Sequence, residues 1–241
     1  MVNVNEWLRR HFAQMDLNEP LFYHVPLGLR FELGYPPRAV DEATYFEQLQ
    51  QRAVELFEQL FGDGRKIYIR TRSFVWANEL EGYQDNHAKE QDDGADAPII
   101  ERWERDTVSL HDFLNKESVS LIVEEERIPE YDEDTGVLDG YHIYSGLECT
   151  IAEIDYPALL AAASYKDFPN KGPMLHEQVY YIDPVRKLIF YMYDDRGLDI
   201  VGLDDSLLRH LYTTYNDWLL DYDRERMDAM FHKVVKGEDQ Q

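Results

Sequence analysis

The chain has 241 residues, of which 44% are hydrophobic and 13% aromatic, so it can fill a core and is not a disordered polymer. Its 48 acidic residues outnumber its 24 basic residues and give a formal net charge of −24. This charge argues against a surface that grips a nucleic-acid backbone or an anionic membrane, because both need clustered Lys and Arg. The single cysteine, Cys149, excludes an intrachain disulfide and a cysteine-based zinc site.

The sequence favours a cytosolic location. Its first residues lack an apolar stretch of signal-peptide length, because Glu6, Arg9 and Arg10 interrupt it. The longest apolar runs are far shorter than the roughly 20 residues of a membrane-spanning helix. Together with a lone cysteine, these features lead us to expect a cytoplasmic protein that does not bind a membrane.

The first third of the chain predicts a helix, a strand and a longer helix. Apolar residues at helical spacing predict a helix over 4–15. Strict alternation of apolar and polar residues over Leu27–Leu33 predicts a half-buried strand. Thr44 and Glu47 have capping-box spacing, so we expect Thr44 to be the N-cap of a helix that ends at Gly62.

The middle of the chain mixes strand patterns with acidic segments. Residues 66–76 are rich in β-branched and aromatic side chains and predict a strand. Residues 78–98 carry seven acidic side chains against one lysine, which predicts a solvated loop or an insert. A short helix over 109–116, a strand over 118–128 and a second acidic loop over 130–139 are expected next.

The last part of the chain predicts four strands and three helices. In chain order these are a strand over 141–154, a helix over 155–164, strands over 178–182 and 187–193 joined by a hairpin turn at 183–186, a strand over 198–203, a helix over 206–220 capped by Asp204 or Asp205, and a helix that ends near 233. Because strands arrive in runs, the fold class is predicted to be α+β, with a mixed, mostly antiparallel sheet and flanking helices. We expect an N-terminal helical segment over 1–17, one domain over 18–233 and a polar tail over 234–241.

The stretch YDDRGLDI, residues 193–200, lies between two predicted strands. Its structural interpretation is a tight hairpin, in which Gly197 takes a positive φ and Asp195 bonds the amides of the turn. Arg196 would pair with Asp199 or with another acid. The alternative is a cluster of carboxylates that holds Mg²⁺ or Ca²⁺ through oxygen ligands. Its members would be Asp194, Asp195 and Asp199, with Asp204 or Asp205 nearby.

The stretch NDWLLDYDR, residues 216–224, mixes large aromatics with acids at the end of a predicted helix. Helical spacing predicts a buried stripe and an exposed Asp217. The members of the stripe are Tyr212, Tyr215, Trp218 and Leu219. Asp223 and Arg224 would form an ion pair at a junction between two helices.

The sequence lacks the patterns of common catalytic and cofactor sites. Its eight histidines show no metal-ligand spacing, and it has neither a Gly-x-Ser-x-Gly elbow nor a glycine-rich phosphate loop. Cys149 lies in an apolar predicted strand and is interpreted as an inert buried thiol. We therefore expect no cofactor, and we favour a protein that is not an enzyme.

The two late stretches, together with LGLRFELG at 27–34, resemble a family of bacterial proteins, common in Gram-positive species, that is catalogued as a domain of unknown function. The resemblance covers roughly residues 20–232, apart from the acidic insert. It implies no activity, cofactor or role for any residue. The positions that we single out as its signature are Asp194, Asp195, Arg196, Gly197, Asp199, Asn216, Asp217, Trp218, Tyr222, Asp223 and Arg224.

Several functions stay open. We favour a binding module whose acidic loops capture a basic protein partner, as immunity proteins and antitoxins do, without direct binding to a nucleic-acid backbone. The alternatives are an acidic mimic of nucleic acid, a metal-dependent enzyme that uses the aspartates of 194–199, and an acidity that only keeps the protein in solution. The candidate binding residues are Asp92, Asp93 and Asp96 in one loop, and Asp132, Glu133 and Asp134 in the other.

Overall fold

A computed structural model describes residues 4–12, 17, 20–34, 41–77, 107–114, 123–168 and 171–231. Its centre is a seven-stranded sheet in which every strand runs antiparallel to its neighbours. In spatial order the strands are β1 (Gly28–Glu32), β9 (Gly197–Gly202), β8 (Leu188–Met192), β7 (Gln178–Asp183), β2 (Ile67–Trp76), β5 (Leu138–Cys149) and β4 (Val123–Tyr131). A short parallel pair, β3 (Thr107–Val108) with β6 (Met174–Leu175), lies apart from it. The predicted α+β class is confirmed.

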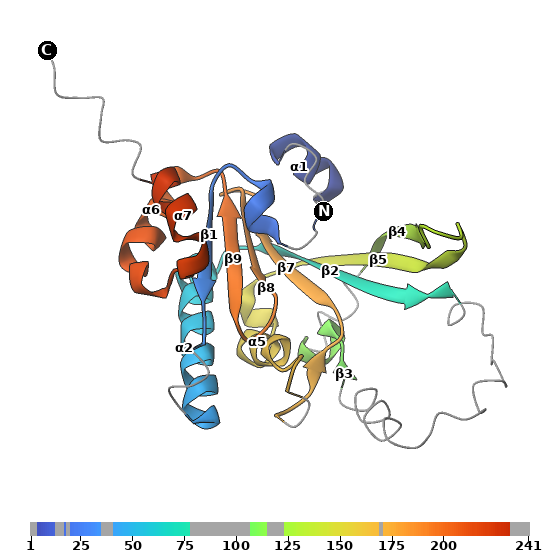
Figure 1. Cartoon of the computed structure of the whole chain (residues 1–241), viewed down its shortest axis with the longest axis horizontal. Coiled ribbons are helices and arrows are strands. Elements are labelled where there is room, and N and C mark those ends of the chain that lie inside the picture. The colour runs from blue at the N-terminus through green and yellow to red at the C-terminus, as the bar shows by residue number, and fades with distance from the viewer. Residues whose placement is uncertain are drawn as a thin grey trace, which may run out of the picture.

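The helices of the described residues lie on both faces of this sheet (Figure 1). The α-helices are α1 (Val4–His11), α2 (Glu42–Phe61), α5 (Tyr156–Ser164), α6 (Asp205–Thr214) and α7 (Arg224–Phe231). The 3₁₀ turns are η1 (Leu21–His24), η2 (Leu110–Phe113), η4 (Ile151–Glu153), η5 (Asn216–Trp218) and η6 (Asp221–Asp223). Side chains of α2, α5 and α6 pack on one face, and those of α1 pack on the other.

The central strands are covered on both faces, so their side chains alternate between two cores. In β8, Leu188 and Phe190 join the core under α2 and α5, whereas Ile189 and Tyr191 join the core under α1. This burial explains the continuous apolar runs of β7 and β8, since a strand covered on both faces needs no polar side. In α1, Trp7 is buried in the same core as Tyr191, so the helix packs on the sheet. The division into a helical segment, one domain and a tail stays a prediction.

Several predicted boundaries are corrected by contacts within the chain. Asp41, and not Thr44, is the N-cap of α2, because its carboxylate accepts from the backbone N–H of Thr44 at 3.0 Å and from the Thr44 hydroxyl at 2.8 Å. The helix predicted over 206–220 ends at Thr214. Beyond Thr214 the chain pairs with the edge strand β1. Leu219 forms a β-bridge with Phe31, and the Leu220 N–H donates to the Arg30 carbonyl at 2.9 Å.

The region predicted as a second acidic loop is mostly a hairpin. Residues 130–131 belong to β4, and residues 138–139 belong to β5. The strand predicted over 118–128 ends at Tyr131, three residues later than predicted, and residues 118–122 lie outside the described residues. The strand predicted over 141–154 ends at Cys149, because a capping box between Thr150 and Glu153 begins η4. The acidic insert of 78–98 lies outside the described residues.

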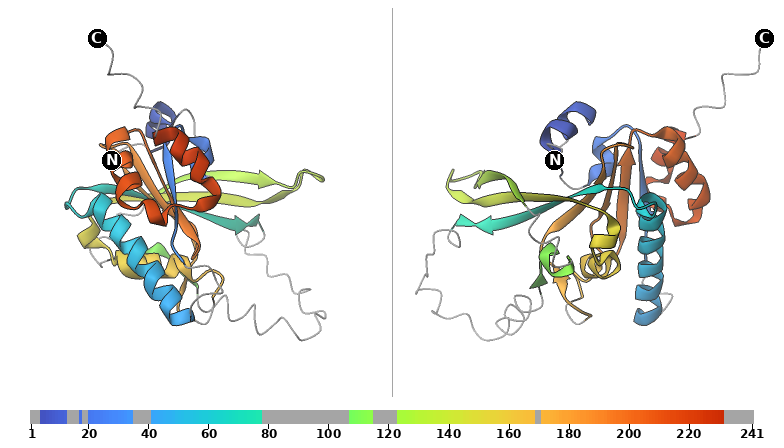
Figure 2. Two further views of the ribbon diagram at one scale, coloured as in Figure 1. Left: turned by 60° about the vertical axis from the view of Figure 1, so that its left-hand side comes forward. Right: turned by 180° about the vertical axis from the view of Figure 1, so that it is seen from behind.

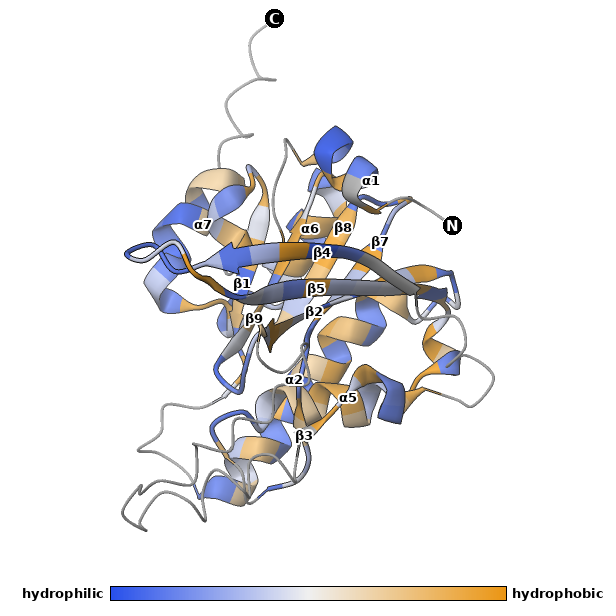
Figure 3. Ribbon diagram, turned by 90° about the vertical axis from the view of Figure 1, so that its right-hand side faces the viewer, coloured by the Kyte–Doolittle hydropathy of each residue, from blue (hydrophilic) through white to orange (hydrophobic). Residues whose placement is uncertain are grey.

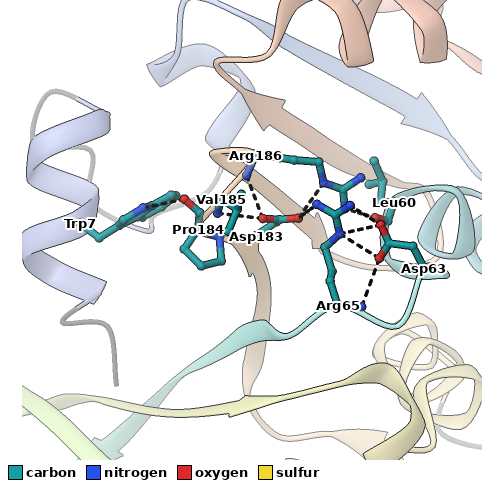
Figure 4. A network of polar contacts seen from close by, with 8 residues as sticks. All are labelled: Trp7, Leu60, Asp63, Arg65, Asp183, Pro184, Val185 and Arg186. Atoms are coloured by element: carbon teal, nitrogen blue, oxygen red, sulfur yellow. Dashed lines mark hydrogen bonds and ion pairs between the residues drawn. The ribbon is translucent and has the colours of Figure 1, made fainter.

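The predicted hairpin turn at 183–186 is confirmed, and one buried carboxylate organises it (Figure 4). Asp183 accepts from the backbone N–H groups of Val185 and Arg186, both at 2.9 Å, and from the Arg186 Nε at 2.6 Å. Its Oδ2 also accepts from Arg65, 3.3 Å away, in the connection between α2 and β2, and Arg186 donates to the Leu60 carbonyl of α2. The Trp7 indole N–H donates to the next carbonyl of the turn, that of Pro184, at 3.3 Å. The turn thus links both layers of helices to the sheet.

Replacing this carboxylate by an amide tests its structural role. Asp183→Asn should lower the free energy of unfolding by about 2–3 kcal/mol, because charge-assisted hydrogen bonds are lost and an N–H₂ group faces donors. The matched control is Asp205→Asn, whose side chain is 50% exposed and should matter by less than about 1 kcal/mol. Urea denaturation of both variants gives the comparison, and equal losses would contradict a special role for Asp183.

Candidate functional site

The turn between β8 and β9 holds the first signature stretch, and its two adjacent aspartates have different partners. Asp194 accepts from the Arg196 backbone N–H and from the Arg196 Nε, both at 2.8 Å. Asp195 instead accepts from the Tyr45 hydroxyl of α2 at 2.6 Å. The turn amide is therefore bonded by Asp194 and not by Asp195, and Arg196 pairs with Asp194. Burial is the main cause that raises the pKa of the Asp195 carboxyl above its usual value.

Gly197 is needed for a close approach and not for a positive φ. Among the residues that the structure describes, the glycines with positive φ are Gly64 and Gly136. A Cβ on Gly197 would lie 2.4 Å from the Tyr193 hydroxyl and 2.5 Å from the Phe31 carbonyl oxygen. The carbonyl belongs to the neighbouring strand β1, so a larger residue would push the two paired strands apart.

Asp199 points away from the other aspartates of its stretch, into a buried ion pair. Its side chain is fully buried, and it accepts from the Arg30 Nε at 3.0 Å and from the Phe22 backbone N–H at 3.1 Å. The Arg30 Nη1 donates to Asp223 at 3.1 Å, and the Tyr23 hydroxyl donates to the same carboxylate at 2.8 Å. Asp199 of the first signature stretch and Asp223 of the second therefore both bond Arg30. Arg30 lies on β1, within the LGLRFELG stretch at 27–34.

Arg30 is held as a cation by this arrangement. Burial acts to lower the pKa of the guanidinium, but the facing carboxylates, Asp199 first, outweigh burial and raise it above the ordinary value. The rings of Tyr23 and Tyr193 lie over the guanidinium, with centroids 5.1 and 5.5 Å from Cζ. Two carboxylates thus share one guanidinium, which locks β1, β9 and η6 together.

The second signature stretch is a pair of 3₁₀ turns and not the end of a helix. Arg224 closes it by donating to the Asn216 carbonyl at 2.8 Å and to the Leu219 carbonyl at 3.2 Å. Asp223 and Arg224 do not pair with each other, because Asp223 faces Arg30. Asp217 is exposed, as predicted, and Tyr222 is 85% exposed.

Trp218 is only half-buried, so the prediction of a fully buried stripe fails at this position. Tyr212, Tyr215 and Leu219 are buried as predicted. Once the α-helix ends at Thr214, helical spacing no longer places Trp218 on their face. Its ring instead lies against Tyr215, with centroids 4.7 Å apart, and under the Arg52 guanidinium at 5.2 Å.

The carboxylate cluster in the structure contains different residues from those predicted. Carboxylate oxygens of Asp167, Asp194 and Asp195 lie within 4.8 Å of one another. Asp199 is held by Arg30 and does not belong to this group, and Asp204 is the N-cap of α6, accepting from the backbone N–H groups of Ser206 and Leu207. A divalent cation with oxygen ligands would fit the chemistry of the three carboxylates. Two of them already bond Arg196 and Tyr45, which gives them a structural role without a metal.

The second candidate region is an arm that projects from the body of the sheet (Figures 1 and 2). We define the arm as residues 72–76 of β2 together with the β4–β5 hairpin, residues 126–144. Figure 3 looks onto this arm and shows that β4 is largely hydrophilic. Residues 126–139 hold six carboxylates against Arg127 alone.

The predicted binding acids 132–134 lie at the tip of the arm. Asp132 is half-buried and holds the turn, since it accepts from the Thr135 backbone N–H at 2.7 Å and from the Thr135 hydroxyl at 2.6 Å. Glu133 and Asp134 are exposed. The other predicted acids, Asp92, Asp93 and Asp96, lie outside the described residues.

The arm also exposes large apolar side chains, which the sequence did not single out. Trp76 is 54% exposed, Tyr131 56%, Val137 62% and Ile128 41%. Four of the eight exposed large hydrophobic residues of the described chain are thus gathered on this one element. Scattered apolar residues need no explanation, but a group surrounded by charges is typical of an interaction surface. The alternation of β4 could have indicated it, because Ile128 interrupts an acidic strand.

The Arg30 ion pairs give a testable expectation. Arg30→Met should lower the free energy of unfolding by about 3–5 kcal/mol, because it leaves two buried carboxylates without their cation. The control is Arg10→Met, whose pair with Glu6 is solvent-exposed and should contribute about 0–1 kcal/mol. Chemical denaturation of both variants measures the two losses of unfolding free energy. A loss for Arg30→Met as small as that for Arg10→Met would contradict a stabilising role of the buried ion pairs.

Comparisons with known proteins agree with the resemblance inferred from the sequence. Within the described part of the chain, no helix is long and apolar enough to cross a membrane. The uncharacterized protein YnaE of Bacillus subtilis (strain 168) is 22% identical over 232 residues, which cover 92% of this chain and 99% of that relative. No solved structure matches the chain. A model of the family described as a domain of unknown function (DUF3885) matches residues 4–223, and this chain belongs to that bacterial family.

Proposed function

We propose that this protein is a non-catalytic binding module that captures a basic protein partner, in the manner of an immunity protein or antitoxin. The observation that carries the proposal is the arm, where exposed apolar side chains and exposed carboxylates share one projecting element. A cytoplasmic location remains part of this proposal.

The two kinds of side chain on the arm would act at different stages of binding. The carboxylates at the tip, with Glu130 at 49% exposure, attract a partner of opposite charge and raise the association rate. The exposed Tyr131, Val137 and Trp76 supply apolar area, and buried aromatic contacts dominate the lifetime of most complexes. The signature cluster at Arg30 supports the scaffold and does not touch the partner.

The experiment separates these two contributions. Partners would first be recovered from the producing cell at low salt and then measured with the full chain. The pair Glu133→Lys and Asp134→Lys should slow association while leaving the melting temperature unchanged, because both side chains are exposed. The pair Tyr131→Ala and Val137→Ala should speed dissociation.

A matched control has the same change of charge at the other end of the molecule. Asp217→Lys with Glu225→Lys reverses two exposed acids near α7, away from the arm (Figure 1), and should leave association nearly unchanged. The proposal fails if no basic partner is recovered at low salt, or if the control pair slows association as much as the arm pair.

A second candidate function, a metal-dependent enzyme, has one observation in its favour, the three carboxylates of Asp167, Asp194 and Asp195. It predicts that Mg²⁺, Mn²⁺ or Ca²⁺ raises the melting temperature, and that Asp167→Asn removes this rise without unfolding the protein. Asp167 is the exposed member and its replacement leaves Arg196 and Tyr45 bonded. Absence of any metal-dependent rise would reject this candidate.

The third candidate, a mimic of nucleic acid, requires a continuous acidic stripe that copies phosphate spacing. On the arm, exposed apolar residues such as Ile128 and Val137 interrupt the carboxylates, which favours a protein-binding surface over a mimic.

A further inference from the structure

A small cavity opens at the root of the arm, where β7 begins. Gln178, its first residue, pairs with Arg72, and beyond this point β2 pairs with β5 alone among the described strands. The cavity has a volume of about 300 Å³ and is distinct from the acidic tip. Its lining includes Arg72, Phe74, His142, Lys166, His176 and Gln178.

The charge of this cavity is opposite to that of the chain. Its described lining holds two cations and two imidazoles, and no carboxylate, whereas the chain has 48 acids and 24 bases. Three acids are neighbours of its lining residues. Glu130 lies against the His142 Nε2, and Asp167 and Glu177 follow Lys166 and His176 in the sequence.

Hydrogen bonds fix two of these cations in place. The Arg72 Nη1 donates to the Gln178 Oε1 at 3.1 Å, and its Nη2 lies 3.2 Å from the His142 Nε2. Lys166 donates to the Tyr193 carbonyl at 2.8 Å, which anchors its amine at the wall. A cation that is already oriented loses little entropy when it binds a ligand.

Two polar atoms of the lining residues are buried without a hydrogen bond. Among the described residues, the Arg72 Nε and the His142 Nδ1 are inaccessible and make no hydrogen bond to protein. Buried polar groups are nearly always satisfied, so both residues keep hydrogen-bonding capacity that the protein does not use. An arginine in the wall of a cavity suits an oxyanion in particular, because guanidinium binds the oxygens of carboxylate and phosphate.

We infer that this cavity binds the oxyanion group of a small ligand, either a phosphate or a carboxylate. Arg72 is the central cation, His176 and the Ser73 hydroxyl donate from the rim, and the ring of Phe74 covers the apolar part of the ligand. This site is independent of the arm's protein partner.

The test uses the full chain and two probes, inorganic phosphate and acetate, by calorimetric titration and by thermal melting. Saturable binding of one probe, with a rise in melting temperature, is expected and identifies which oxyanion is preferred. His176→Gln and Arg72→Gln should each weaken that binding about tenfold or more, since the first removes an imidazole and the second a guanidinium from the lining. The control His210→Gln, on the exposed face of α6, should leave it unchanged.

Folding and binding are separated by the choice of variants. Arg72 bonds its neighbours and its replacement can disturb the strand, whereas the His176 ring makes no hydrogen bond within the described residues, so His176→Gln should melt like the parent. If neither probe binds saturably at millimolar concentration, or if His176→Gln and Arg72→Gln both bind like the parent, the inference is overturned.

Discussion

The buried pairing of Arg30 with Asp199 and Asp223 is the interaction on which the arrangement of this protein depends. It joins residues that are 169 and 193 positions apart in the chain. Without it, the edge strand β1, the strand β9 and the turn η6 would each bury a charge alone, which is costly. The Arg30 carbonyl also accepts from the Leu220 N–H. The same residue therefore ties the segment that follows α6 to the edge strand of the sheet.

The same cluster explains why aspartates that look alike in sequence differ in role. Asp194 bonds its own turn, Asp195 bonds a tyrosine of α2, and Asp199 neutralises Arg30. Alternation along β9 sends Asp199 to one face of the sheet, while the turn keeps Asp194 and Asp195 at its end. Buried carboxylates such as Asp199 are therefore structural, whereas Glu133 and Asp134 at the tip of the arm are exposed.

The body and the arm are built by different rules. In the body both faces of the sheet are covered, so the strands are mostly apolar, and a charged residue within them such as Asp199 is buried in an ion pair. In the arm, the helices no longer cover the strands, and β2, β5 and β4 carry charge, aromatic rings and a cationic cavity at their base. Buried ion pairs such as that of Arg30 with Asp199 lie where coverage is complete, and the exposed apolar residues of the arm lie where it stops.

Local patterns by themselves determined the strands β7, β8 and β9, the hairpin turn at 183–186, the buried thiol of Cys149 and the resemblance to the family. Each of these depends on neighbours within a few residues or on apolar periodicity, and burial indeed raises the pKa of Cys149 to about 12. The end of α6, the half-buried Trp218, the N-cap at Asp41 and the partners of the aspartates were decided only by the tertiary structure. The reason is that most of these features depend on contacts with residues far away in the sequence, such as the bridge of Leu219 to Phe31 or the ion pair of Arg30 with Asp223. Local residue spacing does not encode which distant segment makes such a contact.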